Sequence, residues 1–92
     1  MNRIDNQEER FLYNAILSLQ NHRECNRFLN DLLTPNEFHM IIQRLQIAQM
    51  LSAGFTYNEI YERTGASTAT ISRVNKALVY GNGGLLSVLE KI

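Results

Sequence analysis

The stretch TYNEIYERTGASTATISRVNKAL, residues 56–78, contains two helix start signals separated by a single glycine. Thr56 and Glu59 form the capping-box pattern, in which the threonine hydroxyl accepts the glutamate amide and the glutamate reaches back to the threonine amide. This pattern predicts a short helix over residues 57–64. The helix should end at Gly65, because glycine tolerates the left-handed conformation that a tight exit requires.

A second helix follows within a few residues. The serine before it is a favourable N-cap residue, so the pattern predicts a helix over residues 68–79. Ile60 on the first helix can pack against Ile71 and Val74 on the second. Two short helices joined around a glycine in this way are typical of a helix-turn-helix, here at about residues 56–79.

This packing leaves a small, polar surface on the outside of the second helix. Hydroxyl groups can pair with base edges directly or through water, alanine can meet a thymine methyl group, and basic side chains can reach phosphates. The surface therefore predicts binding to double-stranded DNA, with the preceding helix touching the DNA backbone. The residues expected to meet DNA are Tyr57, Asn58, Tyr61, Ser67, Thr68, Ala69, Ser72, Arg73 and Lys76.

The formal net charge of the chain is zero, but the charge is unevenly distributed. Residues 63–92 carry four basic and one acidic side chain, a net charge of +3, whereas residues 1–31 and 32–62 carry −1 and −2. A protein that binds DNA needs a positive face rather than a positive total. The positive charge gathers where the second helix of the helix-turn-helix lies.

Helical periodicity extends over the rest of the chain, so the fold class is predicted to be all-α, in one domain over residues 1–92. Residues 6–20 and 22–32 read as two helices. A third begins at TPNE, residues 34–37, and runs to about Ala53. Its apolar stripe is expected to comprise Phe38, Ile41, Ile42, Leu45, Ala48 and Leu51. The apolar end of the chain, beyond residue 84, should form a short helical segment that needs a partner surface.

Several classes of protein are disfavoured by composition and pattern. The polar start and the single cysteine predict a cytoplasmic protein without an internal disulfide. No apolar run has the length of a membrane helix. His22 and His39 lie too far apart for a metal site, and no catalytic pairing is present, so we expect neither an enzyme nor a bound cofactor.

Two segments together resemble a known family. LLTPNE at residues 32–37, followed by EIYERTGASTATISR at residues 59–73, is similar to the Trp repressor family, and in particular to its Trp-repressor-like branch of the YerC/YecD type. The clear correspondence covers about half of the chain. The resemblance implies a six-helix subunit in an intertwined homodimer, which binds a near-palindromic operator and regulates transcription, as a repressor.

The resemblance also implies a site for a small, amino-acid-like effector between the long helix and the second helix of the helix-turn-helix. Val74 stands where the family has glycine and Ala77 where it has serine, so tryptophan itself is not expected. Taken alone, Arg44 is more typical of a surface ion pair, with Glu37 or Glu62, than of a ligand site. The positions that match the effector site are Thr34, Arg44, Thr70 and Arg73.

A different class of function also fits the helical pattern. The same hairpin of two helices could contact a partner protein without binding DNA, in which case the chain would be a helical protein-interaction module. The two alternatives differ in a measurable way, because phosphate contacts make DNA binding weaken steeply as salt rises.

Overall fold

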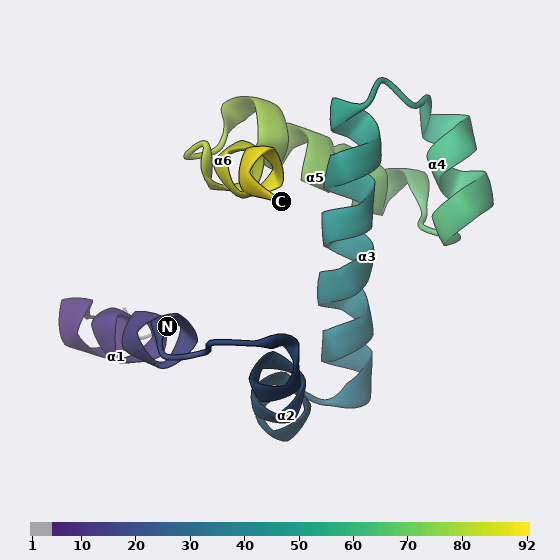
Figure 1. Cartoon of the computed structure of the whole chain (residues 1–92). Helices are drawn as coiled ribbons and strands as arrows, with labels where there is room; N and C mark the ends of the chain where they lie inside the picture. The colour runs from purple at the N-terminus through teal and green to yellow at the C-terminus, as the bar shows by residue number, and fades with distance from the viewer. Residues whose placement is uncertain (1–4) are drawn as a thin grey trace. The chain divides into compact units, whose positions relative to one another are not determined.

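The computed structural model describes residues 5–92, which form six α-helices and no strand (Figure 1). The all-α class is confirmed. The chain divides into two compact units, one ending at Pro35 and the other spanning Asn36–Ile92. No helix of the described part is long and apolar enough to cross a membrane. The helices are α1 (Asn6–Leu17), α2 (His22–Leu32), α3 (Pro35–Ser52), α4 (Tyr57–Thr64), α5 (Thr68–Tyr80) and α6 (Gly84–Lys91).

The first unit contains α1 and α2, and α1 is shorter than the sequence predicted. The expected end at residue 20 is wrong, because the helix ends at Leu17. The Ser18 hydroxyl donates to the carbonyl oxygen of Ala15 at 2.6 Å and closes the last turn. The Asn21 side chain already caps α2 by accepting the amide of Glu24 at 2.9 Å. The linker is therefore used to end one helix and begin the next.

The second unit contains the long helix α3 and the three shorter helices that follow it. The helix begins at Pro35, the position where a missing amide hydrogen costs nothing, and it ends near residue 53 as expected. Gly54 has a φ of 86° at the exit, and the amide of Phe55 donates to the carbonyl oxygen of Met50 at 3.0 Å. This C-terminal motif turns the chain sharply toward α4.

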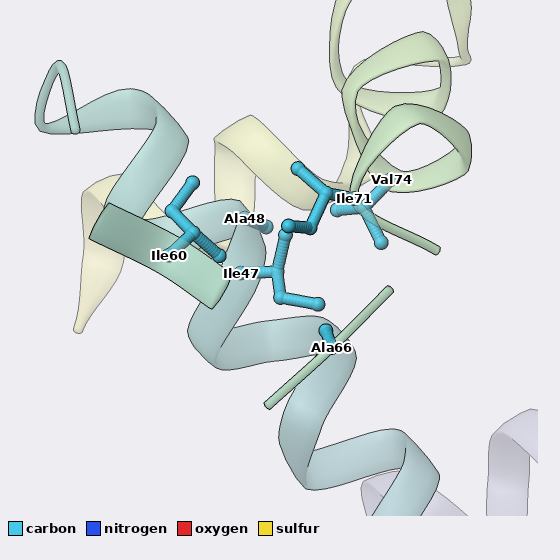
Figure 2. Close-up of a cluster of buried hydrophobic side chains, with 6 residues drawn as sticks. All are labelled: Ile47, Ala48, Ile60, Ala66, Ile71 and Val74. Carbon is cyan, nitrogen blue, oxygen red and sulfur yellow. The ribbon is translucent and has the colours of Figure 1, made fainter. Parts of the chain in front are cut away.

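Six buried side chains form the core of the second unit (Figure 2). They come from α3, α4, the turn after α4 and α5, so this core fixes the helix-turn-helix on the C-terminal half of α3. Each fully buried isoleucine contributes about 2–3 kcal/mol through the area it removes from water. The six residues are Ile47, Ala48, Ile60, Ala66, Ile71 and Val74.

The predicted packing of Ile60 against Ile71 and Val74 is confirmed, but the predicted stripe on α3 is only partly right. Ile47 is fully buried and was not part of that stripe, whereas Ile42 within it is 45% exposed. Residues five apart in an α-helix lie on roughly opposite faces. Ala48 and Leu51 of the stripe do lie in or against the core. The apolar face therefore shifts around the helix toward Ile47 in its C-terminal half, and only that half meets the core.

Candidate nucleic-acid interface

The turn between α4 and α5 is held by the side chain of Thr64. Its hydroxyl donates to the carbonyl oxygen of Ile60 at 2.7 Å and accepts the amide of Ala66 at 3.2 Å. Between them Gly65 has a φ of 72°, in the left-handed region, and its amide donates to the carbonyl oxygen of Tyr61 at 2.8 Å. The buried methyl group of Ala66 anchors the turn in the core. Together these contacts fix the angle at which α5 leaves α4.

The start of α4 is fixed by the capping box that the sequence predicted. The Glu59 amide donates to the Thr56 hydroxyl at 3.1 Å, and the Thr56 amide donates to the Glu59 carboxylate at 3.0 Å. The backbone hydrogen bond from Thr56, supported by the Thr56 side chain and by the charge of Arg63, lowers the pKa of Glu59 below its usual 4.5. The carboxylate is thus held ionised at the N-terminus of the helix, where negative charge is favoured.

The start of α5 uses two of the hydroxyl groups predicted to act in binding. Ser67 accepts the amide of Thr70 at 3.2 Å, and the two hydroxyl oxygens lie 3.1 Å apart. Ser67 is exposed and Thr70 is half-buried. Both hydroxyls are engaged within the first turn of α5, which orders the helix end that the sequence assigned to DNA.

The outward face of α5 lies opposite its buried residues. Successive residues of an α-helix are rotated by about 100°, which places Ala69, Ser72, Arg73 and Lys76 on the outward side, away from Ile71. Three of these four are exposed and Ser72 is half-buried. The structure therefore gathers four of the predicted DNA-contacting residues on one small, polar surface with two positive charges.

A groove of about 390 Å³ borders this face on the side of α4. It is lined by Tyr57, Asn58 and Tyr61 of α4 and by Thr68, the first residue of α5. Tyr57 and Tyr61 are four residues apart and thus on the same face of their helix. All four lining residues were predicted to contact DNA, and the structure brings them to one place.

A pocket of about 310 Å³ lies on the opposite flank of α5, toward α3 and α6. Arg44 and Arg73, both assigned to the effector site by the sequence, line it together with Val74, Ala77 and Leu85. No acidic side chain is among these lining residues. The pocket combines two exposed guanidinium groups with an apolar wall, a composition that suits a small molecule carrying a carboxylate.

The other two residues assigned to the effector site do not line this pocket. Thr70 has its hydroxyl engaged at the start of α5, and Thr34 belongs to the unit that ends at Pro35. The sequence did not identify Leu85 of α6 as a lining residue, because the loop of several glycines before α6 leaves the direction of that helix undetermined by local pattern.

Two further contacts support the interface and had no local signal in the sequence. The Gln43 amide nitrogen on α3 donates to the carbonyl oxygen of Thr64 at 3.1 Å. The Arg63 guanidinium lies over the ring of Phe55, 4.7 Å from its centroid, in a cation–π arrangement. The first contact joins the end of α4 to the middle of α3, and the second joins α4 to the loop after α3, so together they restrict how the helix-turn-helix can tilt.

Comparisons with known proteins agree with this arrangement. The family model described as Trp repressor protein matches residues 7–92. The uncharacterised protein YerC of Bacillus subtilis is 51% identical over 81 residues, which is 88% of this chain and 78% of the relative.

Two solved structures are also similar to this chain. A crystal structure described as a candidate Trp repressor from Staphylococcus aureus has a TM-score of 0.91 and 44% identity, covering 95% of this chain and 87% of that one. A TrpR-like protein from Eubacterium eligens has a TM-score of 0.88 and 47% identity, covering 95% and 89%. The six-helix architecture is therefore that of Trp repressor-like proteins.

Proposed function

This chain belongs to the Trp repressor family. We propose that it is a sequence-specific DNA-binding regulator in the bacterial cytoplasm, which represses transcription by occupying promoter DNA. The family is regulatory and non-enzymatic. The observation that carries the proposal is the outward face of α5, whose small polar side chains stand opposite the buried core. A helix with such a face, held rigidly on a second helix, suits the major groove.

The roles of the side chains follow from their chemistry and their place on α5. Thr68 and Ser72 offer hydroxyls to base edges or bridging water, and Ala69 offers a methyl group. Arg73 and Lys76 supply the positive charge for phosphates. The Ser67 hydroxyl is used as a cap, so its contribution to DNA binding is to order the helix end. Each helix-turn-helix makes few charged contacts with DNA. Two linked copies are therefore needed for useful affinity.

The functional form that we propose is a homodimer. The second unit buries only six hydrophobic side chains, while large apolar side chains on every helix remain exposed. Large apolar side chains exposed in this number favour burial against a partner chain. A two-fold dimer places two α5 helices at a fixed separation, so a near-palindromic operator is the matching target. The exposed residues include Phe11, Leu17, Leu32, Ile41, Ile42, Leu45, Leu86 and Val88.

The pocket beside Arg44 and Arg73 is the proposed site of a small amino-acid-like effector. The two guanidinium groups can hold a carboxylate, and Val74, Ala77 and Leu85 form the apolar wall. Because Arg73 also faces the DNA-binding side of α5, occupancy of the pocket would alter DNA affinity. The valine side chain occupies space beside the pocket and Ala77 offers no hydroxyl, which disfavours tryptophan as the effector.

Selection from random-sequence duplexes tests the proposed function. The chain should enrich a motif with two inverted half-sites about one helical turn apart, and an Arg73→Ala variant should bind the enriched duplex more weakly while keeping its thermal stability. Failure to enrich any motif would favour the protein-interaction module instead. Equal losses of stability and binding in Arg73→Ala would give that residue a structural role.

A further inference from the structure

The loop that joins α5 to α6, residues 81–83, contains the dipeptide Asn82–Gly83. Asn82 is the only asparagine in the sequence that is followed by glycine. Both residues are exposed, and a Cβ at Gly83 would meet no atom within 4 Å. Glycine has no side chain that could shield its own amide nitrogen. Nothing therefore stands between the Gly83 nitrogen and the side chain of Asn82.

The conformation of this loop requires the glycines on both sides of Asn82. A Cβ at position 81 would collide with the carbonyl oxygen of Ala77. Gly83 has a φ of 82°, in the left-handed region that residues with a side chain rarely adopt. The turn into α6 thus places an unshielded amide nitrogen directly after an asparagine side chain.

The two groups that can react make no hydrogen bond within residues 5–92. The Asn82 side chain has no partner there, and the Gly83 amide donates to none. Asn58 is also exposed, but it lies in α4 and is followed by Glu59. The Glu59 amide donates to the Thr56 hydroxyl at 3.1 Å, so that nitrogen is engaged. The chain thus provides its own comparison, with one reactive and one protected asparagine.

We propose that Asn82 is a site of spontaneous deamidation whose isoaspartate product loosens α6. The Gly83 nitrogen attacks Cγ of Asn82, and the new C–N bond closes a succinimide ring. The Cγ–Nδ2 bond breaks, and the nitrogen leaves as ammonia with the former amide proton of Gly83. Solvent water then opens the ring. Its addition at Cγ gives aspartate, and its addition at the backbone carbonyl carbon gives isoaspartate.

The isoaspartate product lengthens the main chain between α5 and α6. Its backbone runs through Cβ and Cγ of residue 82, which inserts an additional carbon into the loop. The first turn of α6 depends on this loop, because the Ser87 amide donates to the carbonyl oxygen of Gly83 at 3.0 Å. Leu85 and Leu89 of α6 pack against the core of the second unit. A longer link should weaken both sets of contacts.

Loss of these contacts also affects the effector pocket. Leu85 lines that pocket beside Arg44 and Arg73, so a loosened α6 removes part of its apolar wall. Either product adds a carboxylate and lowers the net charge of residues 63–92 by one. Asn82→Asp has this charge with a normal backbone, so it separates the effect of charge from that of the longer chain.

The first test ages the full chain at neutral and at mildly alkaline pH and follows it by peptide mass spectrometry. Trypsin releases residues 77–91 with Asn82 as their only asparagine, and residues 45–63 with Asn58 as theirs. Deamidation should be at least about tenfold faster at Asn82, a difference of about 1.4 kcal/mol in activation free energy. The rate should rise with pH, because the Gly83 nitrogen must lose its proton. Isoaspartyl methyltransferase, which labels isoaspartate but not aspartate, identifies the product.

Hydrogen exchange then measures the effect on α6. In the aged chain the amides of α6 should exchange about tenfold faster, while those around Ile47 and Ile71 keep their protection. Asn82→Gln is the control, since its longer side chain closes a ring far more slowly. It should stay unmodified and keep its protection through the same ageing. Asn82→Asp should keep most of the protection of α6.

Equal deamidation rates at Asn82 and Asn58 would overturn the proposal at its first step. Isoaspartate at position 82 without faster exchange in α6 would overturn the loosening of that helix. An equal change in Asn82→Asp would assign the effect to charge, and an equal change in aged Asn82→Gln would assign it to another site. Both results would overturn the proposal. None of these outcomes depends on DNA binding, which selection from random duplexes tests separately.

Discussion

The Gln43 amide nitrogen donates to the carbonyl oxygen of Thr64 at 3.1 Å, joining residues that are 21 positions apart. Thr64 is the last residue of α4, so its carbonyl is one of those that a helix end leaves without an intrahelical partner. The bond therefore completes the helix end and ties the turn of the helix-turn-helix to the middle of α3. It lies next to Arg44, which lines the pocket on the other side of α5.

Removing this bond should weaken both stability and DNA binding. Gln43→Ala leaves a partly buried carbonyl without its donor, and we expect the free energy of unfolding to fall by about 1–2 kcal/mol in a urea titration. DNA affinity should fall further than that loss explains, because the orientation of α5 is less restricted. Gln46→Ala, an exposed change on the same helix, is the control. Equal behaviour of the two variants would show that the bond does not position the helix-turn-helix.

The left-handed conformation of Gly65 should make the stability of the fold sensitive to substitution at this position. A Cβ at this position would meet no atom within 4 Å, so the cost of Gly65→Ala comes from the φ of 72° alone. We expect a loss of about 1–2 kcal/mol in thermal or urea unfolding. Gly84→Ala, at the first residue of α6 and also without steric conflict, should be neutral or slightly stabilising. A Gly65→Ala variant as stable as wild type would contradict the assigned turn.

The capping box at α4 predicts an acid-dependent part of the stability. The pKa of Glu59 is lowered in the folded state, chiefly by the backbone hydrogen bond from Thr56. A carboxyl group of this kind stabilises the fold above its unfolded value of 4.5, and that contribution is lost as the pH falls from there through the folded pKa. Urea midpoints measured between neutral and acid pH should show this loss in the wild type.

Glu59→Gln provides the comparison, because glutamine keeps the capping hydrogen bonds but does not titrate. Its stability should fall less than that of the wild type across the acid range. Glu62→Gln, on the same helix but outside the capping box, should retain the wild-type loss. If the urea midpoints of Glu59→Gln and the wild type changed identically with pH, Glu59 would not be the source of the acid-dependent loss of stability.

Calorimetry tests the effector pocket. A panel of amino acids and related carboxylates should include at least one compound that binds, with an affinity that Arg44→Ala reduces at least tenfold through loss of a charge-assisted contact. Tryptophan should bind weakly or not at all, because Val74 and Ala77 line the space beside Arg73. Absence of heat from every compound at millimolar concentration would exclude control by this class of effector.

Local chemistry explains which parts of the fold the sequence could predict. Both N-caps of the helix-turn-helix and the left-handed Gly65 follow from residues within one turn of each other, and all were confirmed. The burial of Ile47 depends instead on where the helix-turn-helix docks on α3. Because α3 carries apolar residues on two faces, its sequence pattern does not say which face meets the core.

The candidate site shows the same division. The residue types at the start of α5 could be recognised from the sequence, as could the pairing of Arg44 with Arg73 through the resemblance. The groove at Tyr57 and Tyr61 and the bond from Gln43 to Thr64 could not be found as units, because they depend on the angle between helices. Such angles arise from tertiary packing rather than from any local signal.

The salt dependence of DNA binding tests the central claim most directly. In a dimer, two helix-turn-helix motifs that each place Arg73 and Lys76 against phosphates make four basic contacts. A plot of log K against log salt concentration should therefore fall with a slope of about −3.6. The measurement is a gel-shift series with the selected duplex and the wild-type chain. A slope near −3.6 would support a dimer with sparse charged contacts, whereas a slope near zero, or no binding at any salt concentration, would contradict it.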